Sequence, residues 1–144
     1  MNKSPTVRAI LLAVSLCFVG LAGARSTEML EMKRQSIADL YKPLSLDAMR
    51  HAILVGAAVE DWRPAADQPG VVTLAHNSGA GGHLAVVDVL YDAQGWQIVY
   101  RSSEDMNYKH TDKGTEIHPN YNKWIQALDI DIRHAMAEEL MMSH

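Results

Sequence analysis

The chain has 144 residues, enough for one domain that buries roughly two-thirds of its unfolded surface. Its 17 acidic residues outnumber its 13 lysines and arginines, and no basic patch is present, which argues against nucleic acids and anionic membrane surfaces as partners. The only cysteine is Cys17, so the chain beyond it has no disulfide, no thiol nucleophile and no cysteine-ligated metal.

The first 24 residues have the pattern of a signal peptide. Lys3 and Arg8 form a short basic region, and residues 9–24 follow without a charge and end in Ala-Gly-Ala. This run is shorter than the ~20 apolar residues of a membrane-spanning helix, so we predict cleavage after Ala24 and a periplasmic product without a stable membrane span. Lipidation at Cys17 is the alternative, although this cysteine follows a leucine and lies in the middle of the run. Loss of the two basic residues would leave a mature formal charge of −6.

Residues 25–44 are mixed in character and are interpreted as a linker or a short amphipathic helix. A single α+β domain is predicted over residues 45–142. Its first helix is expected to begin after Ser45, a favourable N-cap, and to run to about Trp62. Gly56 lies in the middle of this helix, where it costs ~1 kcal/mol relative to alanine. We therefore expect Gly56, together with Ala57, to let this helix pack closely against a sheet.

Three strand-like segments follow the turn at Pro69-Gly70: residues 71–76, 83–92 and 96–102. The links between them are short, so the strands are expected to form an antiparallel meander. The middle segment is apolar on both faces, which predicts that something covers the second face of the sheet. Residues 25–43, a second subunit and a ligand are the three candidates for that cover.

The last helix is predicted from Pro119 to about Met141, with an apolar stripe along one side. The order helix, three antiparallel strands, helix indicates an α+β two-layer sandwich with both helices on one face of the sheet.

The segment 117–124, IHPNYNKW, marks the start of that last helix. Pro119 has a fixed φ and no amide proton, which suits the first helical position. His118 is then the N-cap, Asn120 can satisfy a second free amide, and Ile117 can close over the first turn as a hydrophobic staple.

The other residues of this segment divide into core and unexplained positions. Tyr121 and Trp124 fall on the apolar stripe and are predicted core residues. His118 is an unusual cap and Asn122 has no evident structural role, so we expect these two residues to hold the loop that follows Ser103.

Four segments carry a resemblance to known proteins: AILVGAAVEDW, PGVVTLAH, LAVVDVLYDAQGWQIVYRSSEDMNY and IHPNYNKWIQALDIDI. Across residues 44–132 the chain resembles a family of small exported bacterial proteins, many of them lipoproteins, with no established function. The helix start IH-x-x-YN-x-W is the most specific part. The resemblance implies a similar fold and an envelope location, and it carries over no catalytic residues. Glu60-Asp61 and the position of Cys17 depart from the family pattern.

The second face of the predicted sheet is the candidate binding surface. We expect it to bind another protein or a small apolar or peptide ligand, or to form a homodimer, through Leu84, Val86, Leu90 and Val99, with Arg101 near the rim. No coherent catalytic constellation is present, so the protein is interpreted as a non-enzymatic interaction module. An enzyme of unknown type is the less favoured alternative.

The segment after residue 103 is rich in side chains that can bind metal ions. Zinc or copper could be held by His110, Asp112, Glu116 and His118, and no other cofactor is predicted. The spacing matches no strong metal signature, and polar loops commonly collect charged residues. Metal handling in the cell envelope is therefore the alternative function.

Overall fold

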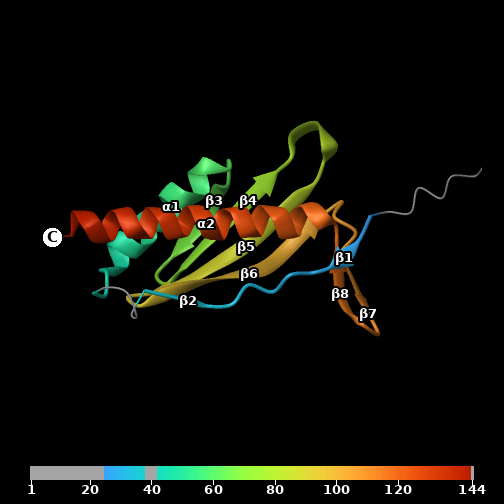
Figure 1. Cartoon of the computed structure of the whole chain (residues 1–144). Helices are drawn as coiled ribbons and strands as arrows, with labels where there is room; N and C mark the ends of the chain where they lie inside the picture. The colour runs from blue at the N-terminus through green and yellow to red at the C-terminus, as the bar shows by residue number, and fades with distance from the viewer. Residues whose placement is uncertain (1–24, 38–41, 144) are drawn as a thin grey trace, which may run out of the picture.

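The computed structural model describes residues 25–37 and 42–143, which form two helices and two antiparallel sheets. The five-stranded sheet has the order β2-β6-β5-β4-β3, and the smaller sheet has the order β1-β8-β7 (Figure 1). The elements are β1 Thr27–Glu28, β2 Gln35–Ser36, α1 Leu46–Val59, β3 Arg63–Gln68, β4 Val71–Asn77, a 3-10 turn Gly79–Gly81, β5 Leu84–Asp92, β6 Gly95–Glu104, β7 Lys109–Thr111, β8 Gly114–Ile117 and α2 Pro119–Met142. The predicted signal peptide lies outside the described residues.

Both helices begin where their capping residues predict. The Ser45 hydroxyl accepts a hydrogen bond from the amide of Ala48 at the start of α1. At the start of α2, His118 Nδ1 accepts a hydrogen bond from the amide of Asn120, and Pro119 is the first helical residue. Neither helix formed by the described residues combines the length and apolarity needed to cross a membrane.

The large sheet has five strands, whereas the meander predicted from the sequence has three. β3 adds to the free edge of β4, because the polypeptide turns back at Gly70 and pairs residues 63–68 with residues 71–75. β2 adds to the opposite edge, pairing Gln35 and Ser36 with Trp96 and Gly95. The sequence did not indicate β3, because the segment RPAADQ is exposed, contains a proline and lacks the apolar alternation of a half-buried strand.

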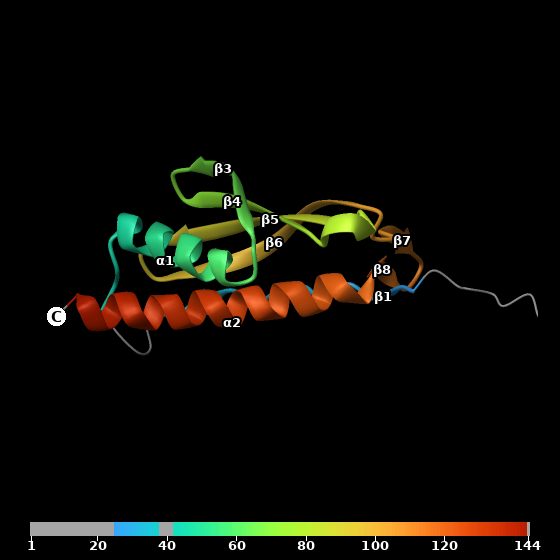
Figure 2. The same ribbon diagram turned by 90° about the horizontal axis from the view of Figure 1, so that it is seen from above.

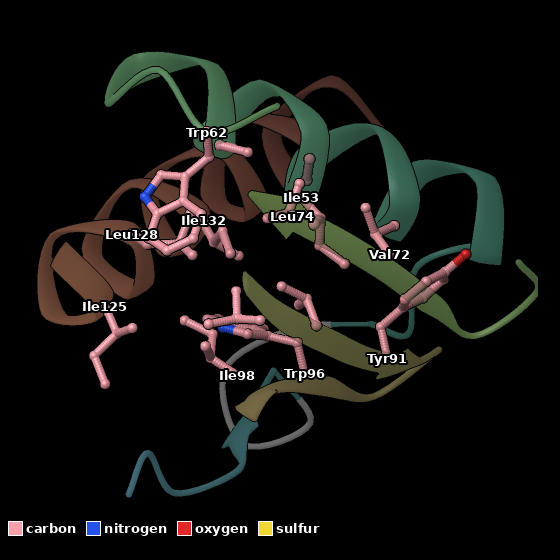
Figure 3. Packing of buried hydrophobic residues seen from close by; sticks show 14 of the residues in the cluster. Ile53, Trp62, Val72, Leu74, Tyr91, Trp96, Ile98, Ile125, Leu128 and Ile132 are labelled. Atoms are coloured by element: carbon pink, nitrogen blue, oxygen red, sulfur yellow. The ribbon is translucent and has the colours of Figure 1, made fainter. Parts of the chain in front are cut away.

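α1 and α2 lie on the same side of the five-stranded sheet, and the hydrophobic core fills the space between the layers (Figures 2 and 3). Alternate residues of β5 point into this core: Ala85, Val87, Val89 and Tyr91 are all buried. Trp96 on β6 extends this face, and its indole Nε1 donates a 3.0 Å hydrogen bond to the buried carboxylate of Asp129 on α2. This polar contact fixes α2 over β6.

The segment after β6 is a second sheet, where the sequence had indicated a polar loop. β7 and β8 form a hairpin, and β1 pairs with β8 through Thr27 opposite Ile117. The hairpin is short and only one of its strand residues, Ile117, is buried, so it lacks the apolar pattern by which strands are recognised in a sequence.

Gly56 allows α1 to touch the backbone of α2. A Cβ atom at this position would lie 2.6 Å from the amide nitrogen of Ile132 and 2.7 Å from its Cα. Real Cβ atoms do not approach other atoms so closely, and the obstacle is helix backbone that cannot rotate away. The close packing predicted from the glycine is present, but the predicted partner was wrong: Gly56 packs against the backbone of α2 and not against the sheet.

Replacing Gly56 with alanine is expected to destabilise the protein although alanine is the better helix former. Overpacking should lower the free energy of unfolding by about 2 kcal/mol, measured by urea denaturation. Ala58→Gly, on the exposed side of the same helix, is the matched control and measures the propensity effect of about 1 kcal/mol alone. Equal or greater stability of the Gly56→Ala protein would contradict the close helix contact.

Candidate functional site

The described residues before α1 form an extended strap, residues 25–37, which spans both sheets. It is extended rather than helical, and it joins β1 in the small sheet to β2 at the edge of the large sheet (Figure 1). Its apolar residue Ile37 is buried, and Met29, Leu30 and Met32 pack against the core. The strap runs beside β6 rather than across the second face of the sheet, and residues 38–41 lie outside the described part of the chain.

The β2 end of the strap is held by two side-chain contacts and by close packing of its backbone against a glycine of β6. Arg34 donates two hydrogen bonds to the carboxylate of Asp92, at 2.6 and 2.7 Å. Arg133 of α2 donates a 2.8 Å hydrogen bond to the side-chain oxygen of Gln35. At Gly95 a Cβ atom would collide with the carbonyl oxygen of Gln35, so glycine is required where the strap meets β6.

Asn122 of α2 anchors the other end of the strap. Its side-chain oxygen accepts a 2.8 Å hydrogen bond from the amide of Leu30, and its side-chain nitrogen donates a 2.8 Å hydrogen bond to the carbonyl of Glu28. The amide of Met29 between them donates to the carbonyl of Thr115. The sequence had suggested that Asn122 holds the loop after Ser103. The structure shows that it holds the strap, which is 92 to 94 residues away along the chain.

His118 contacts the segment after β6, as expected. Its amide donates a 2.6 Å hydrogen bond to the carbonyl of Met106, a residue that is itself buried. Its ring lies 4.8 Å from the ring of His83, and a ring nitrogen of His83 contacts the carbonyl of Asp105. Burial and the neighbouring His83 lower the pKa of His118. His118 therefore caps α2 and also binds the segment that follows β6.

Between its two anchors the strap stands away from β6 and leaves a cleft of about 370 Å³. This strap cleft is lined on one side by the strap and on the other by β6, the hairpin and α2: Met29, Leu30, Glu31, Met32, Gln97, Ile98, Val99, Tyr100, Tyr108, His110, Thr115 and Tyr121. A single hydrogen bond crosses it among the described residues, from the side chain of Gln97 to the carbonyl of Met32. A larger hollow of about 630 Å³ lies on the other side of the strap and includes Asn122.

Three tyrosines form one wall of the strap cleft. The rings of Tyr100 and Tyr108 are stacked, with centroids 4.5 Å apart and planes 8° from parallel. Tyr121 meets Tyr100 edge-on at 5.7 Å, and His110 meets Tyr108 edge-on at 5.3 Å. Such stacked and edge-on pairs hold each other in place. The cluster is a rigid aromatic surface in which Tyr108 remains 37% exposed.

The hydroxyl groups of this tyrosine cluster differ in their partners. The Tyr100 hydroxyl hydrogen-bonds Ser103 at 2.9 Å, and the Tyr108 hydroxyl hydrogen-bonds His110 at 3.1 Å. The Tyr121 hydroxyl has no hydrogen-bond partner among the described residues, although Tyr121 is only 1% exposed and lines the cleft. Burial raises the pKa of Tyr121, so this hydroxyl stays protonated and can both donate and accept.

The outer edge of β6 is open along the strap cleft. β2 pairs only with Gly95 and Trp96, while β5 pairs along the whole other edge of β6 as far as Glu104. Beyond Trp96, no described strand pairs with the outer edge of β6. Its outward backbone groups therefore face the cleft without a ladder partner.

The acidic residues that line the two hollows are glutamates of the strap. Glu31 lines both of them and Glu28 lines the larger, while none of the described residues that line either hollow is a lysine or arginine. Two cations of the strap and the hairpin form ion pairs elsewhere, Arg34 with Asp92 and Lys109 with Glu116.

The residues predicted for the second sheet face do lie together on one face, opposite the helices. Leu84 and Val86 are half-buried, and Leu90 and Val99 are 38% and 37% exposed. The centre of this open face is polar: Asp88 accepts hydrogen bonds from Thr73 at 2.6 Å and from Arg101 at 2.9 Å. Of the five predicted residues, only Val99 also lines the strap cleft.

The four residues predicted as metal ligands do not converge. His110 contacts Tyr108 and Thr115, Glu116 forms an ion pair with Lys109, and His118 caps α2. Asp112 lies in the turn between β7 and β8. In the part of the chain that the structure describes, no group of three or more His, Cys, Asp or Glu side chains could hold a metal ion.

Sequence reasoning missed the strap cleft because its parts are far apart along the chain. The repeated tyrosines of the segment 100–121 are a sequence feature that could have indicated an aromatic binding surface. However, nothing local indicates that the strap, residues 25–37, passes beside them.

A second aromatic cluster lies away from the cleft. His76 on β4 lies between two tryptophans, with its ring centroid 5.1 Å from Trp62 and 4.5 Å from Trp124. His76 Nδ1 and Trp62 Nε1 are buried without a hydrogen-bond partner among the described residues. Burial lowers the pKa of His76, and hydrogen bonding to the backbone of Glu60 and the charge of Asp61 oppose this only in part.

Comparisons with known proteins gave no match: no family model, no curated protein and no solved structure is similar to this chain.

We expect replacement of Asn122 by alanine to release one end of the strap. The loss of two hydrogen bonds should lower the free energy of unfolding by about 2 kcal/mol and speed amide hydrogen exchange at Leu30. Lys123→Ala, an exposed neighbour on the same helix, is the control and should change neither. Unchanged exchange at Leu30 in the Asn122 variant would show that the strap is held by other contacts.

Protonation of His76 is expected to destabilise the protein in mild acid. Because the folded state lowers the pKa of His76 below its ordinary value of 6.5, the unfolded state binds more protons as the pH falls through that region. Stability should therefore decrease from about pH 7.5 to about pH 5.5, and His76→Phe should weaken that decrease.

Two further variants separate the contribution of His76 from those of other histidines: one is expected to leave the pH dependence unchanged and one to weaken it. His134→Asn changes an exposed histidine of α2 and should keep the full pH dependence. His118→Asn keeps a capping side chain and should weaken the dependence in its own right, since the pKa of His118 is also lowered. Thermal unfolding at each pH gives the comparison, and identical curves for His76→Phe and the parent protein would refute the role of His76.

Proposed function

We propose that this protein is an exported, non-enzymatic binding module whose ligand site is the strap cleft. The observation that carries the proposal is the tyrosine cluster at the wall of the cleft, where Tyr121 is 1% exposed and its hydroxyl makes no hydrogen bond to the described residues. A hydroxyl at the wall of a cleft can donate a hydrogen bond to a bound molecule and accept one from it. A ligand with a polar group near Tyr121 would provide such a partner.

The shape and lining of the cleft support binding rather than a purely structural role. Its rigid tyrosine wall offers apolar area and hydroxyl groups together, a combination enriched in recognition sites. The strap is anchored at both ends by Asn122 and Arg34, so the site can be preformed and lose little entropy when it is occupied. The export proposal rests on the sequence of residues 1–24 alone.

The open sheet face is a second candidate surface, as a homodimer interface. It is favoured by the exposure of Leu90 and Val99, which are large apolar residues on neighbouring central strands. Its polar centre at Asp88 and Arg101 makes it a less apolar surface than the sequence had indicated.

The cleft can be tested without knowledge of the natural ligand. Indole, N-methylacetamide and benzylamine are titrated separately into isotope-labelled protein, and amide shifts are followed by NMR. Each probe matches one property of the cleft: aromatic stacking, hydrogen bonding or negative charge. We expect shifts at residues 29–32 and around Tyr108, and Tyr108→Ala should weaken binding about tenfold. Leu46→Ala, an exposed apolar residue on α1, is the control and should leave binding unchanged.

Three outcomes of this experiment would contradict the proposal. Shifts confined to Leu84, Val86 and Leu90, or shifts that follow protein concentration rather than probe, would instead support the open face. The absence of any shift in the strap and tyrosine residues with all three probes would exclude the cleft as a ligand site.

A further inference from the structure

The groups that line the two sides of the strap cleft indicate which class of ligand it can bind. Along β6 the cleft runs beside Gln97, Ile98, Val99 and Tyr100, the part of the strand that follows the last pairing with β2. Such an edge carries a row of backbone amide and carbonyl groups that is complementary to another extended chain. A peptide that lay in the cleft would continue the ladder that β2 begins at Trp96.

The strap allows this addition because it does not itself complete the ladder. Its backbone groups are used at the ends, where Leu30 bonds to Asn122 and Ile37 bonds to the carbonyl of Gln94. In the intervening part, the only hydrogen bond to β6 among the described residues is made by the side chain of Gln97. An added strand would lie about 4.8 Å from β6, on the side of that strand that the cleft borders.

The charge of the residues that line the cleft is the second feature that limits which ligands can bind there. Glu31 stands at the cleft, no described lysine or arginine lines it, and Glu28 adds negative charge in the adjoining hollow. The exposed ring of Tyr108 lies on the same cleft and can face a cation. A lysine or arginine side chain fits both groups, whereas an acidic side chain would be repelled by Glu31.

We propose that the strap cleft binds an extended, positively charged peptide segment, which adds as a strand to the outer edge of β6 and places a lysine or arginine against Tyr108 and Glu31. Main-chain hydrogen bonds supply affinity in this mode of recognition, and the side-chain contacts supply specificity. The inference rests on the proposed function, because it assigns a ligand class to the same cleft.

The test uses three synthetic heptapeptides with blocked ends and the whole chain from residue 25. The first peptide alternates threonine with lysine, and the second alternates threonine with glutamate. The third repeats the first with N-methyl groups on alternate amides along the edge that would pair. N-methylation removes the ladder donors and leaves the charge unchanged. Binding is measured by calorimetry and mapped by NMR.

We expect the lysine peptide to bind at the cleft and to shift the amides of residues 97–100. The glutamate peptide and the N-methylated peptide should each bind at least about tenfold more weakly. Glu31→Lys should reduce binding of the lysine peptide by a similar factor, and Glu138→Lys, which makes the same charge change on the exposed side of α2, should have a much smaller effect.

The outcomes separate this inference from the proposed function. Equal binding of the lysine peptide and its N-methylated form would refute strand addition. Equal binding of the lysine and glutamate peptides would refute the charge preference. If indole or N-methylacetamide shifts the cleft residues and no peptide does, the cleft is a binding site for another class of ligand and the inference fails alone. If neither the small probes nor the peptides shift these residues, the proposed function fails as well.

Discussion

The close contact between α1 and α2 at Gly56 is the constraint on which the rest of the structure depends. Because no side chain separates the helices there, the backbone of α2 lies directly against α1 at Ile132. The path of α2 across the sheet is then fixed, and Asp129 meets the indole nitrogen of Trp96. A shift of α2 by even part of a helical turn would break this buried hydrogen bond and leave the indole nitrogen of Trp96 without its partner.

The position of α2 in turn places one wall residue of the candidate site and the side chains that anchor the strap. Its first turns carry Tyr121, which forms part of the tyrosine cluster, and Asn122, which binds the strap. One turn beyond Asp129, Arg133 reaches both that carboxylate and Gln35 of the strap. The single helix α2 therefore covers the hydrophobic core and also anchors both ends of the strap. The cleft remains because the anchors hold the strap at its ends and leave its middle unpaired.

The open sheet face and the strap cleft differ in what they offer a partner. The open face has already satisfied its central polar groups within the protein, through Asp88, Thr73 and Arg101. The cleft has groups without a hydrogen-bond partner among the described residues, namely the hydroxyl of Tyr121 and the outer edge of β6 beyond Trp96. Binding at the cleft would therefore add hydrogen bonds as well as bury apolar area, and this is the physical reason for preferring it.

The sequence by itself determined the elements whose signals are local. Ser45 and the pair His118-Pro119 specify helix starts through contacts within a few residues, and the alternation in residues 84–92 specifies which residues of β5 share a face. The α+β class and close packing at Gly56 also follow from such short-range patterns, whereas the partner at Gly56, α2 in place of the sheet, does not. Only the tertiary structure decided the five-strand sheet, the second sheet, the strap and the partner of Asn122. These features join residues that are far apart in the chain, such as Thr27 with Ile117 and Gln35 with Trp96, and most of their side chains are exposed. Exposed edge strands need no apolar periodicity, so the pattern that reveals a core cannot reveal a cleft built at the edge of a sheet.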